Sequence, residues 1–389
     1  MRILFSTTAN DGHFGPLLPF ARACVAGGHD VRVAAPESYG AALARAGVRH
    51  EPFADAPPEL IGPIMAGLPR MSVPETDHVM VREVFGRVDA QAALPGLLDT
   101  IERWRPDVVI RESAEIASIA AAEHAGVPHL HVAVGMREAA ARLAADIAEP
   151  LEELGPLAGL AEGRTSAALA DETIVSVVPE LLDYASGEVP AGDTTVYRFH
   201  EPVPAISGRP PAEWGDPDLP LVYVTFGSVA GSLPPFAGIF REALDVLADF
   251  DVVVLMTVGR AFDPGDLGLL PTNARVEQWV PQETVLMHAA AMLGHGGFGT
   301  TMGALAAGVP QVVAPLFAFD QVINGEHVAA IGAGLTTGLG QGVVARGAGE
   351  ISLLLEDSSY TEAAVRIAAA LRELPPPADV VPVLAGLAS

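Results

Sequence analysis

The chain has 389 residues, half of them hydrophobic, which is long enough for two domains with separate cores. Its 48 acidic and 22 basic side chains give a formal net charge of −26, and a field of that sign repels nucleic acid and anionic lipid. We therefore expect no nucleic-acid partner and no membrane partner, and no apolar run reaches the roughly 18 residues that a membrane-spanning helix needs.

The amino end and the cysteine content indicate where the protein works. Only a few apolar residues precede Ser6, too few for the core of a secretion signal, so this end is expected to form a strand. The single cysteine, Cys24, excludes an intramolecular disulfide and lies on the apolar face of a predicted helix. Both features predict a cytoplasmic protein.

The first half of the chain alternates predicted strands and helices. The expected elements are a strand at 2–7, a helix at 16–26, strands at 30–35 and 108–110, helices at 94–104 and 114–125, and a strand at 129–134. Strands that alternate with helices in this way form parallel sheets with short, right-handed connections. The sequence therefore predicts a Rossmann-like domain of the α/β class.

The periodicity fails between Gly187 and Leu219, where prolines and glycines punctuate the chain, and this stretch is predicted to be a linker. A second α/β series follows, with strands expected at 221–225, 252–257, 274–277 and 311–314, and helices at 236–248 and 361–374. One internal repeat, Ala125–Pro128 and Ala307–Pro310, ends a helix at glycine in each half and supports two similar domains.

The most informative motif begins at His295 and continues through Gly296, Gly297, Gly299 and Thr300. Adjacent glycines let the backbone approach a ligand closely, and the amides that open the following helix can bind an anion, which we expect to be a pyrophosphate.

Two polar residues, Asp320 and Gln321, follow the predicted strand 311–314 and so fall at the carboxyl edge of a parallel sheet, where α/β folds bind ligands. Short polar side chains at this edge can bind sugar hydroxyls. With Trp279-Val280-Pro281-Gln282 upstream, the stretch from Trp279 to Val328 resembles the donor-binding signature of family 1 glycosyltransferases, in particular those of actinobacterial natural products.

The resemblance implies a GT-B architecture, with two Rossmann-like domains whose parallel sheets face each other across a cleft. Its expected parts are an acceptor-binding domain at 1–205, a linker at 206–218, a nucleotide-sugar-binding domain at 219–374, and a tail at 375–389 that packs back on the first domain. A homodimer is compatible with the sequence.

A catalytic base is implied at His13, which lies in the loop after the first strand and before a helix that Pro16 opens. The positive end of that helix disfavours protonation of the imidazole, which suits a base near neutral pH. The family orients this histidine with a carboxylate from a later strand end, where it commonly has aspartate. Glu112 is the candidate here, Glu115 is its rival, and a surface pair of Arg111 with Glu112 is the structural alternative.

The donor site implied by the resemblance extends beyond the central motif. Trp279 would stack on a pyrimidine base whose edge the Val280 backbone contacts, while the amides of Gly227 and Ser228 and the Ser228 hydroxyl would point at the β-phosphate. The predicted donor-binding residues are Gly12, Ser228, Trp279, Val280, His295, Gly296, Gly297, Gly299, Thr300, Asp320 and Gln321. No metal and no cofactor are expected, because the helix end and His295 can offset the charge of the leaving group.

The acceptor is expected to bind in the first domain as a hydrophobic small molecule. Residues 53–90 combine flexible apolar side chains with prolines and glycines, a composition that suits either a cleft or an ordinary core. The predicted acceptor-binding residues are Met65, Met71, Met80, Phe85 and Met136.

The nucleotide is predicted from one missing carboxylate. Many relatives that use UDP-sugars have a glutamate three residues after the Gly-Thr pair, where it binds the ribose hydroxyls, and this chain has Gly303 there. A deoxyribose loses less by this absence, so the sequence favours a dTDP-deoxysugar as the donor substrate. The alternative is that Gly303 only permits tight helix packing.

Other functions fit the sequence less well. A nicotinamide-dependent oxidoreductase lacks support because neither 7–15 nor 225–231 carries a G-x-G-x-x-G loop. A nucleotide-sugar epimerase does not explain Trp279-Val280-Pro281-Gln282. A non-catalytic, glycosyltransferase-like partner would be expected to lose His13 or the donor motif, and a UDP-sugar-dependent transferase is the remaining alternative. The sequence leaves open the aglycone, the sugar, and O-, C- or N-transfer.

Overall fold

The computed structural model describes residues 1–185, 194–200, 211–233 and 236–388, so residues 206–210 of the predicted linker lie outside the described part. Contacts divide the chain into two compact units. Unit 1 comprises Met1–Val178, Val189–Glu201 and Leu374–Ser389, and unit 2 comprises Pro179–Glu188 and Pro202–Glu373. By this division the segment that begins at Pro179 and the predicted linker group with unit 2, and the chain returns to unit 1 at Leu374.

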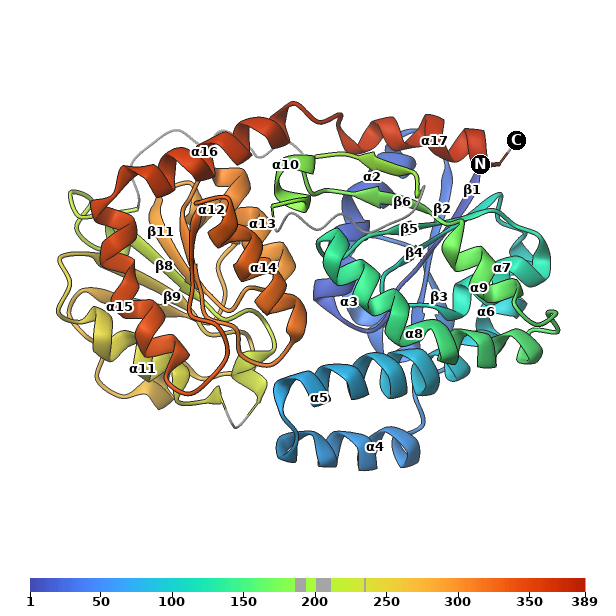
Figure 1. Ribbon diagram of the computed structural model, residues 1–389, viewed down its shortest axis with the longest axis horizontal. Helices are drawn as coiled ribbons and strands as arrows, with labels where there is room; N and C mark the ends of the chain where they lie inside the picture. Colours follow the sequence, from blue (N-terminus) through green and yellow to red (C-terminus); the bar gives the residue numbers. More distant parts are fainter. Residues whose placement is uncertain (186–193, 201–210, 234–235, 389) are drawn as a thin grey trace. The chain divides into compact units, whose positions relative to one another are not determined.

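Unit 1 contains, among its described residues, a seven-stranded parallel sheet in the order β3-β2-β1-β4-β5-β6-β7 (Figure 1). The strands are β1 (Arg2–Ser6), β2 (Asp30–Pro36), β3 (His50–Phe53), β4 (Val108–Glu112), β5 (His129–Val132), β6 (Thr173–Ser176) and β7 (Val196–Arg198). Along β1, Ile3 and Phe5 pack into one core while Leu4 packs into the core on the opposite face, as strand geometry requires. A sheet buried on both faces explains why its strands are continuous apolar runs.

The helices of unit 1 connect these strands. They are α1 (Asp11–Phe14), α2 (Leu18–Ala26), α3 (Gly40–Ala46), α4 (Pro58–Gly67), α5 (Val73–Val79), α6 (Ala90–Trp104), α7 (Ala117–Ala125), α8 (Arg137–Leu157), α9 (Arg164–Ala170) and α17 (Val380–Leu387). A π-helix, η4 (Met80–Asp89), lies between α5 and α6, and short 3₁₀ turns occupy Gly15–Leu17, Glu37–Tyr39, Leu68–Arg70 and Pro377–Asp379. Figure 1 shows α4 and α5 at one margin of this unit, away from its sheet.

Helix α17 follows unit 2 in the chain but packs in unit 1. Its Val380 and Leu384 are buried in the same core as Ile3 and Phe5. The preceding turn, Pro377–Asp379, contacts α2, and Figure 1 shows α17 close to the amino terminus.

Unit 2 contains a six-stranded parallel sheet among its described residues, in the order β10-β9-β8-β11-β12-β13. The strands are β8 (Leu221–Thr225), β9 (Val253–Thr257), β10 (Ala274–Glu277), β11 (Ala289–Gly294), β12 (Gln311–Val313) and β13 (Gly334–Thr336). The helices are α10 (Glu180–Asp183), α11 (Ile239–Leu247), α12 (Gln282–Leu286), α13 (Phe298–Ala307), α14 (Phe319–Ala330), α15 (Val343–Glu356) and α16 (Ser358–Arg372), with 3₁₀ turns at Ala212–Trp214, Ala230–Ser232 and Pro264–Leu267.

The two sheets share one topological property that positions functional side chains. The strand order reverses direction between β1 and β4 in unit 1 and between β8 and β11 in unit 2. Loops that leave the carboxyl ends of such a strand pair diverge and open a crevice, the usual ligand site of open α/β sheets. The segments after β1 and β4, and those after β8 and β11, are therefore the places to look for a site.

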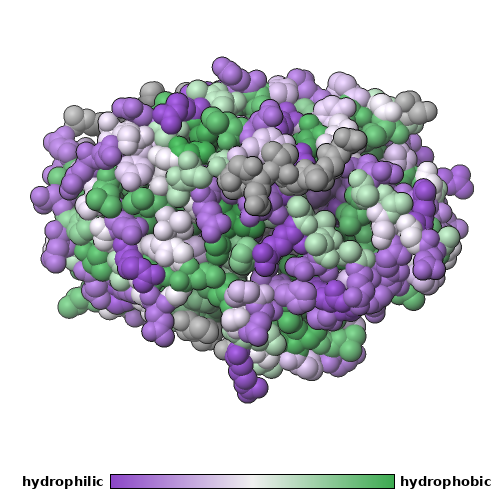
Figure 2. Space-filling model, viewed as in Figure 1, coloured by the Kyte–Doolittle hydropathy of each residue, from purple (hydrophilic) through white to green (hydrophobic). Residues whose placement is uncertain are grey.

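The described part of the chain contains no helix that is long and apolar enough to cross a membrane. On the face drawn in Figure 2, hydrophilic and hydrophobic residues are interspersed.

Candidate active site

His13 and Glu112 meet at the reversal point of the unit 1 sheet. The Nδ1 atom of His13 lies 2.8 Å from Oε2 of Glu112, the last residue of β4. The sequence predicts His13 in a loop, whereas the structure places it in the four-residue helix α1. The side chain of Asn10 caps this helix by accepting the N–H of Gly12 at 2.7 Å, which stabilises the turn and fixes the histidine.

The carboxylate of Glu112 is buried and held at both oxygens. Its Oε1 atom accepts the amide and the hydroxyl of Thr8, each at 3.1 Å, and its Oε2 atom also accepts the amide of Ala114 at 2.7 Å. Burial alone raises the pKa of Glu112, but the charge and hydrogen bond of His13 and the backbone amides outweigh it and lower the pKa to about 2. An ionised carboxylate only accepts hydrogen bonds, so His13 donates from Nδ1, and whenever its ring is neutral the lone pair is on Nε2.

Neither alternative for Glu112 agrees with the structure. Arg111 is buried and forms a bidentate ion pair with Glu172, so it is not the surface partner of Glu112. Glu115 accepts the amide of Ser118 with Oε1 rather than binding His13, and burial raises its pKa. The strand continues two residues past the predicted end at Ile110, which explains the burial of Arg111 and Glu112.

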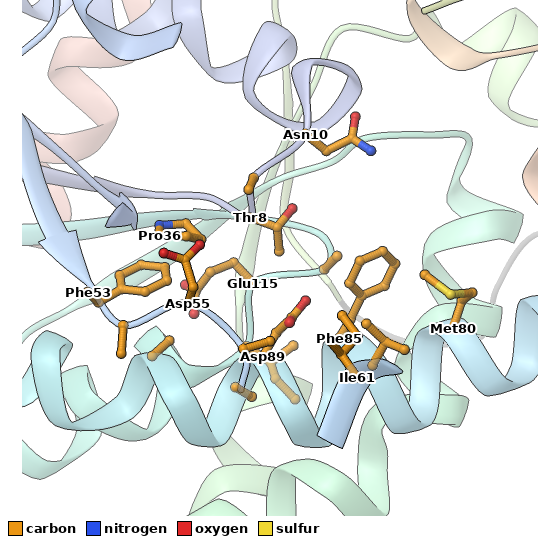
Figure 3. Close-up of a pocket in the computed structure, with 18 of the residues that line it drawn as sticks. Thr8, Asn10, Pro36, Phe53, Asp55, Ile61, Met80, Phe85, Asp89 and Glu115 are labelled. Atoms are coloured by element: carbon orange, nitrogen blue, oxygen red, sulfur yellow. The ribbon is translucent and has the colours of Figure 1, made fainter. Parts of the chain in front are cut away.

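A cavity of about 350 Å³ adjoins this pair in unit 1 (Figure 3). Thr8, which binds Glu112, lines it, and so does Phe85, whose ring centroid lies 5.6 Å from that of His13. The lining residues are Thr8, Ala9, Asn10, Pro36, Phe53, Ala54, Asp55, Ala56, Ile61, Met65, Met80, Val84, Phe85, Asp89, Ala90, Ala93, Ala114, Glu115 and Ile116. The cavity is therefore lined mostly by apolar side chains, together with the carboxylates of Asp55, Asp89 and Glu115.

Three of the five predicted acceptor-binding residues line this cavity, namely Met65, Met80 and Phe85. Met71 and Met136 are not among its lining residues. Met71 is partly exposed after a 3₁₀ turn, and Met136 is fully buried at the start of α8, where its apolar side chain serves packing. The sequence does not point to Asp55 and Asp89, because a cleft for a hydrophobic acceptor is predicted there from apolar residues alone.

In unit 2, His295 follows β11 at the second reversal point and is buried. Its ring lies against Gly227 and Gly297, where an added Cβ would come within 2.7 Å and 2.5 Å of ring atoms. Burial lowers the pKa of His295 to about 4, so the ring is neutral near pH 7. Its Nδ1 atom is buried and has no hydrogen-bond partner among the described residues.

The glycines after His295 shape the start of α13. Gly296 has φ +86°, and a Cβ there would meet the backbone oxygen of Gln321 at 2.7 Å, so only glycine fits. The side-chain amide of Asn324 donates to the Gly296 carbonyl at 2.8 Å and holds the loop. Gly297 is the N-cap of α13 and supplies no side-chain cap, so the first amides of the helix remain for a ligand.

The remaining predicted donor residues divide into two groups. Gly299 and Thr300 lie in the first turn of α13, Ser228 is exposed in the turn after β8, and Asp320 lies in the first turn of α14. Gln321 also stabilises the loop before α14, because its Oε1 atom accepts the amides of Leu316 and Phe317. The amide of Gly12, another predicted donor-binding residue, donates to Oδ1 of Asn10 within α1.

Trp279 is 54% exposed and borders an open hollow of about 610 Å³. The guanidinium of Arg260 lies 4.5 Å from the centre of the Trp279 ring, and both residues line the hollow with Phe262 and Asp263. A large exposed aromatic side chain with a cation on its ring provides a stacking surface. Val280, predicted beside it, packs partly into the core of unit 2.

The comparisons with known proteins agree with this arrangement. The C-terminal domain model of the erythromycin biosynthesis protein CIII-like family matches residues 241–387, and its N-terminal domain model matches residues 22–193. The chain belongs to this family. Its relatives make it a glycosyltransferase of natural-product, and in particular antibiotic, biosynthesis.

Two relatives and one solved structure illustrate the similarity. The glycosyltransferase is 33% identical to the elloramycin glycosyltransferase ElmGT of Streptomyces olivaceus, and 31% identical to the L-demethylnoviosyl transferase of Streptomyces niveus, in each case over 98% of this chain and 96% of the relative. The crystal structure of the glycosyltransferase VinC in complex with dTDP superposes with a TM-score of 0.76 at 26% identity, covering 100% of this chain and 99% of that one. The predicted family and GT-B fold class are confirmed, and the oxidoreductase, epimerase and non-catalytic alternatives are excluded.

Proposed function

We propose that this glycosyltransferase is inverting and metal-independent, and that it moves a hexose or deoxyhexose from a dTDP-sugar to a hydroxyl of a hydrophobic natural-product aglycone. The observation that carries the proposal is the His13–Glu112 pair beside the apolar cavity of unit 1. The ionised Glu112 fixes the histidine tautomer, and the cavity provides a place for the aglycone.

In the proposed reaction the acceptor hydroxyl gives its proton to Nε2 of His13. The acceptor oxygen then bonds to the anomeric carbon from the face opposite the leaving group, the bond from that carbon to the phosphate oxygen breaks, and the nucleoside diphosphate leaves. Glu112 remains ionised and stabilises the imidazolium that forms, as carboxylates do for other catalytic histidines. A positioned base of this kind contributes roughly 10²- to 10⁴-fold in rate.

The donor is proposed to bind in unit 2. The first amides of α13, with the Thr300 hydroxyl, would bind the pyrophosphate, and the neutral His295 would donate one hydrogen bond. Trp279 would stack on the base. The described residues contain no group of three or more His, Cys, Asp or Glu side chains arranged to hold a metal ion, and the proposed phosphate contacts need none.

The choice of dTDP rests on Gly303, which supplies no carboxylate to a ribose 2′-hydroxyl. The VinC structure, in complex with dTDP, supports this choice. A UDP-sugar is the second candidate, because Gly303 has a packing role in the structure, described below.

The proposal is tested with a panel of dTDP- and UDP-sugars against aromatic and macrolide aglycones, with products detected by mass spectrometry. A glycoside whose anomeric configuration is opposite to that of the donor is the expected product. Absence of any glycoside, or a product that retains the donor configuration, would contradict the proposed function.

A further inference from the structure

The π-helix η4 (Met80–Asp89) forms one wall of the cavity in unit 1. Its wider i→i+5 turn places residues four to five positions apart on one face, and Met80, Val84, Phe85 and Asp89 all line the cavity. Figure 3 shows Phe85 and Asp89 directed from this helix into the cavity. Helices of this type are uncommon and are often found at functional sites.

The opposite face of η4 packs against α8 and forms ion pairs with it. Arg87 binds Glu149 at 2.9 Å and Glu153 at 2.7 Å, and a Cβ at Gly86 would come within 3.0 Å of Pro150. With the outer face held in this way, the inner face presents Asp89 at a fixed place in the cavity wall.

Asp89 is a carboxylate without a protein partner. It has no hydrogen bond or ion pair among the described residues, whereas Asp55 nearby accepts the amide of Ser38 at 3.0 Å. Burial, and then the charges of Asp55 and Glu112, raise the pKa of Asp89 to about 6, so it is mostly ionised at pH 7.5.

The other acidic residue of the lining also lacks a full set of partners. Glu115 is 3% exposed, and its Oε2 atom has no hydrogen bond among the described residues. The lining contains no arginine, lysine or histidine side chain to balance Asp55, Asp89 and Glu115. Asp55 is exposed and bonded to Ser38, and burial raises the pKa of Glu115, which favours its neutral form. Asp89 is therefore the lining carboxylate that stays ionised without a partner, and a cationic ligand would supply its counter-charge.

From these observations we infer that the acceptor carries a protonated amine that pairs with Asp89, while its aromatic body fills the cavity between Phe53 and Phe85. This inference rests on the proposed function, since it assigns the cavity to the acceptor. A neutral hydroxyl would supply a hydrogen bond but would leave the charge of Asp89 unbalanced. The net charge of −26 also attracts a cation to the protein.

The test uses three 1,8-dihydroxyanthraquinones that differ only at carbon 3, which carries an aminomethyl, a hydroxymethyl or a carboxyl group. Their binding to the full chain is measured by calorimetry at pH 7.5 in the presence of saturating dTDP. We expect the aminomethyl compound to bind roughly tenfold more tightly than the hydroxymethyl compound, the low end for a hydrogen bond to a charged group, and the carboxyl compound to bind most weakly.

Asp89→Asn should reduce the ratio between the aminomethyl and hydroxymethyl compounds to near one. The matched control is Asp99→Asn, which removes the same charge from an exposed site on α6 and should leave the ratio unchanged. Equal affinities in the unmodified protein, a ratio that survives Asp89→Asn, or no binding of any of the three compounds would each overturn the inference. The comparison in the unmodified protein stands even if Asp89→Asn does not fold.

Failure of the inference is distinguishable from failure of the proposed function. Sugar transfer to the hydroxymethyl compound without an amine preference would retain the function and refute the inference. An amine preference in binding with no transfer from any donor would leave Asp89 as a cation-binding residue and contradict the proposed function.

Discussion

The side-chain amide of Gln282 occupies the space that any side chain at position 303 would need. A Cβ added to Gly303 would overlap Nε2 of Gln282, and this amide donates to the Gly299 carbonyl in the first turn of α13. A side chain at position 303 would therefore have to displace the end of the flexible Gln282 side chain from its exposed hydrogen bond, whatever the nucleotide. The preference for dTDP rests on the missing carboxylate and on the similarity to VinC, whose structure holds dTDP.

Competition calorimetry should show tighter binding of dTDP than of UDP, because a ribose 2′-hydroxyl would remain incompletely paired. One unpaired hydroxyl corresponds to about 1 kcal/mol or more, which is several-fold in affinity. Equal binding, or tighter UDP, would refute the prediction and favour the UDP-sugar alternative.

His13→Ala should lower the turnover number by about 10²- to 10⁴-fold while leaving dTDP affinity unchanged, because the base acts only in the chemical step. Steady-state kinetics and calorimetry separate the two effects. Near-normal turnover would place the base elsewhere.

Glu112→Gln should lose less turnover than His13→Ala, since the amide keeps one hydrogen bond to His13 but not the charge that stabilises the imidazolium. Glu115→Gln is the matched comparison, a neighbouring buried glutamate that binds the Ser118 amide. The assignment of the orienting carboxylate moves to Glu115 if only that variant loses activity.

Gly297→Ala should weaken dTDP binding and cost about 1–3 kcal/mol of folding stability, because the new methyl group meets the His295 ring in a packed loop. Gly299→Ala is the control two residues on, where an added Cβ meets nothing within 4 Å and the amide is kept. Calorimetry with dTDP and thermal melting measure both effects. Equal behaviour of the two variants would show that the His295 position is not important for the donor.

His131 should make the protein sensitive to mild acid. Burial, reinforced by the charge of Arg111, lowers the pKa of His131 to about 3, against roughly 6.5 in an unfolded chain. As pH falls below about 6.5 the unfolded chain binds a proton that the folded chain excludes, so this residue's contribution to stability decreases.

Thermal melting of the unmodified protein and His131→Gln at pH 7.5 and pH 5 isolates this effect from carboxylates such as Asp89, whose raised pKa acts in the opposite direction. Between pH 7.5 and pH 5 the melting temperature should fall less for His131→Gln than for the unmodified protein. Parallel declines would contradict the assignment.

The strand order explains why much of the site was predictable. His13 and Glu112 are 99 residues apart, yet both follow strands that flank the reversal point, so an α/β pattern and a family motif were enough to pair them. The same reasoning located His295 beside the turn at Gly227.

The errors arise where local geometry departs from regular periods. The residues on one face of a π-helix repeat with neither the α-helical nor the strand period, so the sequence does not place Asp89 in the cavity wall. Met80 and Phe85 are predicted there only because they are apolar. The sequence also does not show that the Oε1 atom of Gln321 accepts two backbone amides, because those contacts depend on the fold of the loop before α14. Short polar caps, such as Asn10 at α1, likewise depend on three-dimensional contacts.

The packing of α17 in the core of unit 1 also affects how the protein is made. The ribosome completes unit 2 before it reaches Val380 and Leu384, so unit 1 lacks part of its core until the rest of the glycosyltransferase has been synthesised. A fragment that stops near residue 205 would leave that apolar surface exposed to solvent and prone to aggregation. Residues translated after unit 2 thus complete the core of a unit whose other strands are translated before it.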